Sequence, residues 1–228
     1  MFAYPPRTEI DHRTLKLIVG LIALSLASLT SLLADTAITS ISASYYESGP
    51  SHVIFIGFLF AIAAFFFAYN GYTPLQMIAS KVAAIATLCI ALFPCDCDGH
   101  KPLVPYVHGA SAAVTFAILA FFCYVFFKRA IKKPSGPAKS RAFIYATCGV
   151  VIVLVILVLA VDRLLSHSIS LQLPRLTYYG EKTALVAFGL SWLSASHWLP
   201  VITTKEERLA RLTPQPQVMP AAPAGATT

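Results

Sequence analysis

The chain has 228 residues, of which 57% are hydrophobic and only 12% are charged, and its mean hydropathy is +0.71. Soluble domains carry about 25% charged residues, so this composition excludes an ordinary soluble domain. The formal net charge of +7 does not indicate a nucleic-acid partner. Basic residues beside membrane spans fix topology and attract anionic headgroups, which accounts for the charge. We therefore expect an integral membrane protein that contacts membrane lipids and binds no nucleic acid.

Six segments are long and apolar enough to cross a hydrocarbon core of about 30 Å, which takes roughly 20 residues. They are residues 15–34, 52–70, 76–93, 108–127, 142–161 and 179–202. They predict an all-α fold, a six-helix transmembrane bundle over residues 15–204 that follows an arm of residues 1–14. Residues 205–228 are rich in Pro and Ala and lack apolar periodicity, which predicts a largely disordered tail.

Lys and Arg alternate between the two sides of this bundle. All but four of the 17 lie in the arm, the second and fourth connections and the tail; the exceptions are Lys101, Arg163, Arg175 and Lys182. Cytoplasmic segments beside spans are enriched in Lys and Arg. Both termini, and therefore the arm and the tail, are predicted to be cytoplasmic.

Acids and histidines gather at the opposite helix ends. Ionisable residues close to membrane segments are functional candidates by default. They predict an outward-facing pocket that binds a lipid headgroup, a small solute or a partner, lined by Asp35, Tyr45, His52, Asp96, His108, Asp162 and Glu181. The alternative is that these side chains simply reach the headgroup region, where an acid costs little, with Glu181 favoured by its helix dipole.

The densest chemistry is the run Cys95-Asp96-Cys97-Asp98-Gly99-His100. Thiolate, carboxylate and imidazole are ligands for zinc or copper, so a metal site is predicted from Cys95, Cys97, His100 and His108. The Cys-x-Cys spacing differs from the Cys-x-x-Cys of common zinc knuckles. A disulfide between the two cysteines, or pairing with another chain, stays open.

Two further features bear on function and packing. His52 and His108, at the same end of the bundle, are the residues that a haem would need as axial ligands, which is the weakest of the cofactor hypotheses. Small residues at helical spacing, Gly109 with Ala113 and Ala27 with Ser31, are expected at close helix contacts.

The chain also resembles a family of proteins. The runs Ile41-Ser42-Ala43-Ser44-Tyr45-Tyr46, Tyr69-Asn70-Gly71-Tyr72 and Ala91-Leu92-Phe93-Pro94, with a lone His108 and Glu181 before the last span, are similar to an uncharacterised group of bacterial six-span membrane proteins. The resemblance extends more distantly to the FRAG/DRAM/SFK group and to the ceramidase-like membrane hydrolases. It implies a helical bundle in the bacterial inner (plasma) membrane, with a membrane-protein partner or a homo-oligomer as open alternatives.

The hydrolase resemblance supplies an alternative function, a metal-dependent hydrolase of lipid amides or esters. Its candidate catalytic residues are Asp35, Ser42, His108 and Glu181. Ceramidase-like enzymes hold zinc with three histidines, two of them in a His-x-x-x-His pair on the last helix. Here the corresponding segment contains only His197. Zinc would have to be held instead by His52, His108 and a carboxylate or Cys97.

Overall fold

The computed structural model describes residues 12–97, 99–102 and 104–204, and these residues are helical, with no strand among them. Seven α-helices follow one another along this part of the chain: five long helices, then a short one, then a last long one. They are α1 (His12–Leu32), α2 (Pro50–Ala68), α3 (Pro74–Leu92), α4 (Val107–Ala130), α5 (Gly136–Leu164), α6 (Ser168–Gln172) and α7 (Leu176–Ala195). Two 3₁₀ turns, η1 (Ser42–Tyr45) and η2 (Pro200–Ile202), lie in the connections.

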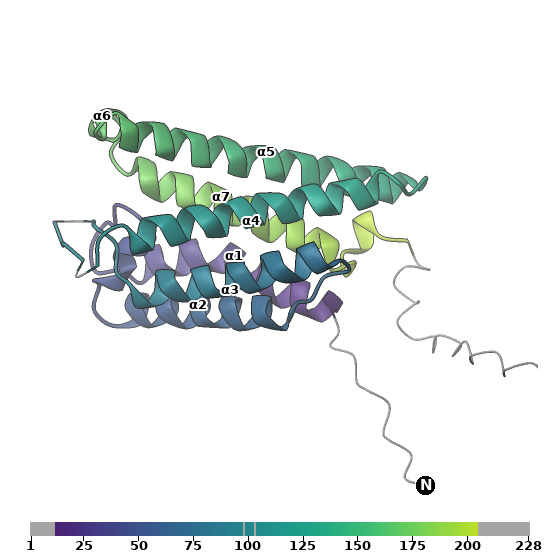
Figure 1. The fold of residues 1–228 in the computed structure, drawn as a ribbon, viewed down its shortest axis with the longest axis horizontal. Helices are drawn as coiled ribbons and strands as arrows, with labels where there is room; N and C mark the ends of the chain where they lie inside the picture. The colour runs from purple at the N-terminus through teal and green to yellow at the C-terminus, as the bar shows by residue number, and fades with distance from the viewer. Residues whose placement is uncertain (1–11, 98, 103, 205–228) are drawn as a thin grey trace, which may run out of the picture.

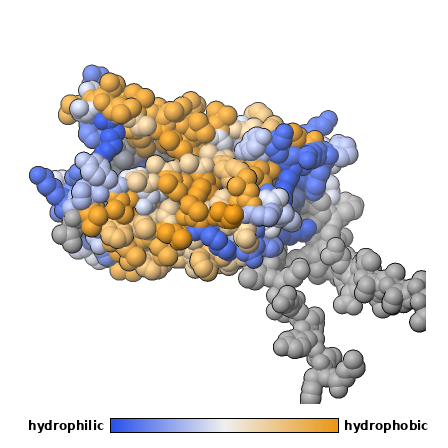
Figure 2. All heavy atoms as spheres, viewed as in Figure 1, coloured by the Kyte–Doolittle hydropathy of each residue, from blue (hydrophilic) through white to orange (hydrophobic). Residues whose placement is uncertain are grey.

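The six long helices form a closed ring. Each helix from α1 to α5 packs against the next one in the chain, and α7 packs against both α5 and α1 to close the bundle (Figure 1). On the face shown in Figure 2, the surface between the polar ends of the bundle is largely apolar. This surface is what a bilayer requires of a helical bundle, because lipid cannot satisfy exposed polar groups.

Five of the six expected spans are confirmed as helices long and apolar enough to cross a membrane, namely α1 to α5. The predicted bounds agree with the structure to within a few residues, except that α5 begins at Gly136. α7 is long enough but less apolar, because Glu181 and Lys182 lie in its first turns. It also ends at Ala195, and not at 202 as predicted.

The predicted N-terminal arm and C-terminal tail lie mostly outside the described residues. α1 already begins at His12, so residues 12–14 of the predicted arm belong to the first helix. The predicted tail, residues 205–228, lies outside the part of the chain that the structure describes.

Aromatic side chains fill the centre of the ring. Trp192 of α7 is fully buried, and its indole packs within 5.2–5.9 Å of the rings of Phe66, Phe122 and Phe188, centroid to centroid. Aromatic pairs at such spacings add to the area that they bury. The centre of the bundle is therefore a packed core and not a pore.

The tightest helix contact is one that the sequence analysis missed. A Cβ added at Gly189 of α7 would lie 2.9 Å from the carbonyl oxygen of Gly20 in α1, and a Cβ at Gly20 would lie 3.0 Å from the oxygen of Gly189. Small residues let membrane helices approach in this way. The expectation for Gly109 was wrong, because a Cβ there would meet nothing within 4 Å.

The two ends of the bundle differ in chemistry, and we name each after one residue. The Glu181 end contains the starts of α2, α4 and α7 and the ends of α1, α3 and α5, with α6 at its corner. The Arg141 end contains the opposite termini of the same helices. The predicted layer of acids and histidines lies at the Glu181 end.

Candidate functional site at the Glu181 end

The connection between α1 and α2 folds back over the Glu181 end. Ile38 and Ile41 are each 2% exposed and pack with Leu26, Phe55 and Tyr178 in an apolar cluster. Burying these side chains draws the loop onto the bundle, since each fully buried aliphatic side chain contributes about 1.5–3 kcal/mol. Ser42 follows Ile41 directly and begins the turn η1.

Five hydrogen bonds tie this loop to the start of α7, 137 to 140 residues away in the chain, and three of them involve residues 38–41. The Tyr178 amide donates to the Thr39 carbonyl (3.1 Å), and Arg175 Nε donates to the Ile38 carbonyl (2.9 Å). The Ile41 amide donates to Glu181 Oε2 (2.6 Å). The carbonyls of Ile38 and Thr39 and the amide of Ile41 are thereby satisfied.

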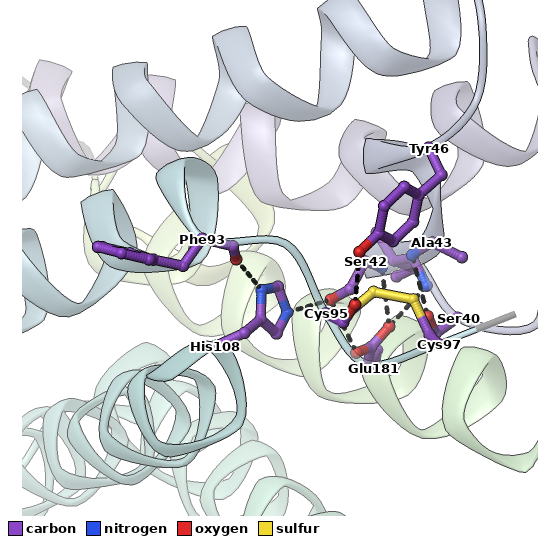
Figure 3. The surroundings of a disulfide bond; sticks show 10 residues. Ser40, Ser42, Ala43, Tyr46, Phe93, Cys95, Cys97, His108 and Glu181 are labelled. Atoms are coloured by element: carbon purple, nitrogen blue, oxygen red, sulfur yellow. Dashed lines mark hydrogen bonds between the residues drawn. A yellow bond between two sulfur atoms is a disulfide. The ribbon is translucent and has the colours of Figure 1, made fainter. Parts of the chain in front are cut away.

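Glu181, Ser42 and His108 form a continuous hydrogen-bonded chain (Figure 3). Ser42 Oγ lies 3.2 Å from Glu181 Oε1 and 2.9 Å from His108 Nε2, and the Ser42 amide points to Glu181 Oε2 at 3.4 Å. The other ring nitrogen of His108, Nδ1, lies 2.7 Å from the Phe93 carbonyl at the end of α3. The chain thus connects the first loop with α3, α4 and α7.

The number of protons in this chain follows from its partners. The Phe93 carbonyl only accepts, so Nδ1 of His108 carries a proton. If the imidazole is neutral, Ser42 donates to Nε2, and the Ser42–Glu181 bond then needs a proton on Glu181. If His108 is an imidazolium, it donates to Ser42, which donates to a Glu181 carboxylate. The two states contain equal numbers of protons and differ by a proton shifted along the three residues.

This chain lines a pocket of about 530 Å³, to which every connection at this end contributes. The pocket is visible as a recess between α6 and the α3–α4 connection (Figure 2). Of the seven residues predicted to line a pocket, four do so, namely Asp96, His108, Asp162 and Glu181. Ser42, Arg163 and Arg175 line it as well.

The acids that line the pocket differ in their hydrogen bonding and in their exposure. Asp162 Oδ1 accepts from the Ile169 and Ser170 amides (3.0 and 2.9 Å), and its Oδ2 lies 3.2 Å from His167 Nδ1. It therefore fixes α6 to the end of α5. Asp96, on the α3–α4 connection, is an exposed residue that lines the same pocket, which makes it the acid most accessible to a ligand.

Asp35, Tyr45 and His52 are not among the residues that line this pocket. Asp35 Oδ2 accepts from Ser48 Oγ (2.7 Å), and the Asp35 amide donates to Glu47 Oε2 (2.8 Å). His52 Nδ1 lies 2.5 Å from the Tyr45 carbonyl. These residues hold the second half of the first connection in place.

The cysteine-rich run forms a disulfide between Cys95 and Cys97, so neither sulfur is a thiolate ligand in this structure. Tyr46 packs across this segment: its hydroxyl donates to the Cys95 carbonyl (2.8 Å), and its ring stacks on the exposed His100 at 4.0 Å. Burial, with smaller effects of Tyr45 and Asp96, raises the pKa of Tyr46, which keeps the phenol protonated as a donor. This segment forms a wall of the pocket.

The described residues do not bring together the ligands that the metal and haem hypotheses require. Among the described residues, no group of three His, Cys, Asp or Glu side chains is placed to hold a metal ion. Both ring nitrogens of His108 are hydrogen-bonded, and His52 lies outside the pocket. The three-ligand zinc site of the hydrolase hypothesis and the two-histidine haem site are therefore not assembled by these residues.

Arg163 and Arg175 are the site residues that the sequence analysis missed. It counted both only as basic residues on the minority side of the membrane. Their position, Arg163 in the last turn of α5 and Arg175 directly before α7, was the available signal, because these helix ends carry the predicted Asp162 and Glu181.

Comparison with protein families, with characterised proteins and with solved structures finds no match to this chain. The family resemblance noted in the sequence therefore stays a prediction. The function is argued from the geometry of the site alone.

The hydrogen-bonded chain makes a prediction about Glu181. In Glu181→Gln the amide oxygen accepts from the Ile41 amide and the amide nitrogen donates to Ser42, so we expect a loss of less than about 1 kcal/mol in the free energy of unfolding. Glu181→Leu leaves these donors without an acceptor, and we expect a loss of about 1–3 kcal/mol or more. Denaturant unfolding in detergent measures both.

Thr183→Leu is the matched control, because Thr183 lies on the same turn of α7 but is exposed. We expect little change in its stability. Combining Glu181→Leu with His108→Ala should cost less than the sum of the two, since groups in one network are not additive. Equal losses in the Gln and Leu variants would contradict the hydrogen-bonded chain.

Proposed function

We propose that this protein binds the headgroup of a zwitterionic membrane lipid in the pocket at the Glu181 end. The observation that carries the proposal is that groups of both charges line that pocket and come from different elements. Arg163 lies in the last turn of α5, Arg175 directly precedes α7, and Asp96 lies on the α3–α4 connection. A phosphate suits the two guanidinium groups, and an ammonium group suits the carboxylate.

The apolar wall of the pocket favours a lipid over a purely polar solute. Gly109 and Ala112 of α4 and Leu159 of α5 line the pocket beside its charged groups. Gly109 is exposed, and a Cβ there would meet nothing within 4 Å. This wall leaves room for the first part of an acyl chain between α4 and α5, while the headgroup lies against the arginines.

The Glu181–Ser42–His108 chain, which forms the floor of the pocket, has no net charge and can shift a proton between its two ends. With one proton shared between Glu181 and His108, the three residues together carry no net charge in either arrangement. The Glu181 carboxylate and the His108 imidazolium occur in the same state, so a bound ammonium group and a bound phosphate both favour that charge-separated state over the neutral one. A bound zwitterion therefore shifts a proton along the three residues, and the chain neither takes up nor releases one.

We further propose that α7 crosses the membrane as a sixth span and that the pocket faces away from the cytoplasm. α7 packs along both α1 and α5, which are apolar enough to cross. Thirteen of the 17 Lys and Arg residues belong to the sequence segments around the Arg141 end, within or next to the helices, which supports a cytoplasmic position for both termini. A bacterial inner membrane, which the family resemblance implies, stays a prediction.

The sidedness is tested with reporter fusions in the intact cell. Fusions at Gly71, at Gly136 and after Arg211 should report a cytoplasmic position, because they follow the basic helix ends. Fusions at Gly49, Gly99 and Ser170 should report the external side. If the fusions after Arg211 and at Ser170 report the same side, α7 does not cross, and the six-span arrangement is wrong.

Lipid binding is tested by native mass spectrometry of the protein in non-ionic detergent. We expect phosphatidylethanolamine to bind more tightly than phosphatidylcholine, because its primary ammonium donates hydrogen bonds to Asp96 and a quaternary ammonium does not. Arg163→Gln should weaken the binding of both lipids by about tenfold, and Asp96→Asn should remove most of the difference between them.

The control is Lys101→Gln, which removes one positive charge at the same end from an exposed residue that does not line the pocket. Equal effects of Lys101→Gln and Arg163→Gln would show that only the general surface charge matters. Phosphoethanolamine, titrated alone, separates the sources: binding as tight as that of the lipid would replace the lipid with a small solute. Absence of binding to either would contradict the proposed function.

A further inference from the structure

A second, smaller cavity lies beneath the floor of the pocket at the Glu181 end, among residues of α1, α2, α3, α4 and α7. Its volume is about 50 Å³. Ser42 and Glu181 line both the pocket and this cavity, so the two spaces share this pair of residues as a wall. Phe66 and Phe188, whose rings contact Trp192, line the cavity as well. The cavity therefore extends from the polar floor to the aromatic core.

Two threonine hydroxyls at this cavity have no hydrogen-bond partner among the described residues. They belong to Thr87 of α3, which is 1% exposed, and to Thr115 of α4, which is 7% exposed, and both residues line the cavity. A hydroxyl buried without a partner costs free energy, and the large majority of buried polar side-chain atoms are paired. The two hydroxyls therefore indicate that the cavity holds a polar ligand.

Thr30 of α1 shows how a buried threonine of this bundle is satisfied without a ligand. Its Oγ1 donates to the Leu26 carbonyl one turn earlier in the same helix (2.8 Å). Such a bond is open to Ser and Thr inside helices. Thr87 and Thr115 also lie inside helices but do not form it, so their hydroxyls stay available to a ligand in the cavity.

We propose that this cavity binds water, which is held by Thr87 and Thr115 together with the Ser42–Glu181 pair. A water molecule fills about 30 Å³ in the liquid, and buried water usually forms two to four hydrogen bonds, so the cavity has room for about one or two. The four polar side chains that line it supply the partners. Drug-sized ligands occupy pockets of about 300–1,000 Å³, so the volume favours water over a larger solute.

Water in this site extends the Glu181–Ser42–His108 chain into the bundle. It connects the proton that this chain shares with the hydroxyls of α3 and α4. The path ends there, because the aromatic rings of Phe66 and Phe188 pack against Trp192 below the cavity. The site is therefore a hydrated end of the hydrogen-bonded chain and not part of a channel. It does not depend on lipid binding in the pocket.

The test is hydroxyl-radical footprinting by X-ray radiolysis, with the full chain in non-ionic detergent and without added lipid. Radicals that form from a bound water oxidise the side chains beside it, even where bulk solvent does not reach them. Phe188 lines the cavity and is 1% exposed, whereas Phe122 is equally buried and does not line it. We expect oxidation of Phe188, with Phe122 at background.

The variant is Thr87→Val with Thr115→Val, which removes both hydroxyls and nearly keeps the shape of the side chains. Oxidation of Phe188 should fall to the level of Phe122, since water in a cavity needs polar partners. Thr30→Val is the matched control, because it removes a buried hydroxyl that does not line the cavity, and it should leave the oxidation of Phe188 unchanged. Thermal unfolding in the same detergent shows that each variant is folded.

Background oxidation of Phe188 in the native protein would overturn the proposal, because the cavity would then be dry. Oxidation that persists in the double variant would overturn the assignment to Thr87 and Thr115. A clearly higher unfolding temperature of the double variant would also overturn it, since removal of unpaired hydroxyls stabilises a protein and removal of water-bound ones does not. A failure of lipid binding in the pocket would leave all of these results unchanged.

Discussion

A carboxylate in the first turns of α7 that is removed from water needs donors, and Glu181 obtains them from the first loop. The Ile41 and Ser42 amides and the Ser42 hydroxyl all point to its two oxygens. A buried acid without partners costs several kcal/mol, and so do buried loop amides without acceptors. The Glu181 carboxylate and the loop amides therefore satisfy each other's hydrogen bonds, and this holds the loop, α7 and His108 together. The pocket exists because this exchange holds its floor in place.

The rest of the bundle brings these groups to one point. The contact of Gly20 with Gly189 lets α7 approach α1 closely, and the apolar side chains of Ile38 and Ile41 hold the loop against the same helices. Phe93 ends α3 with a carbonyl that accepts from His108. A helix end leaves such carbonyls without intrahelical partners, so the imidazole serves both the fold and the site.

Much of this architecture could be predicted from the sequence, because the bilayer imposes the same requirements on every helix that crosses it. These requirements appear in the sequence as apolar segments with Lys and Arg between them. The exceptions are informative. α7 is less apolar than α1 to α5 because its first turns contain Glu181 and Lys182, and it packs against both α1 and α5. Asp35 and His52 lie at the same end of the bundle as the site but form hydrogen bonds with the first connection. The amino-acid composition of a loop does not predict the path that its backbone takes. Glu181 was predicted, but its partners were not, because backbone amides carry no signature in the sequence.

The central claim is that Glu181 accepts hydrogen bonds from the Ile41 and Ser42 amides, and hydrogen exchange at these two amides tests it most directly. In the native protein we predict exchange as slow as in the first turns of the neighbouring helices, although neither amide is in a long helix or a strand. Glu181→Leu should accelerate both amides selectively, and Glu181→Gln should not. Fast exchange in the native protein, or identical exchange in all three proteins, would contradict the account.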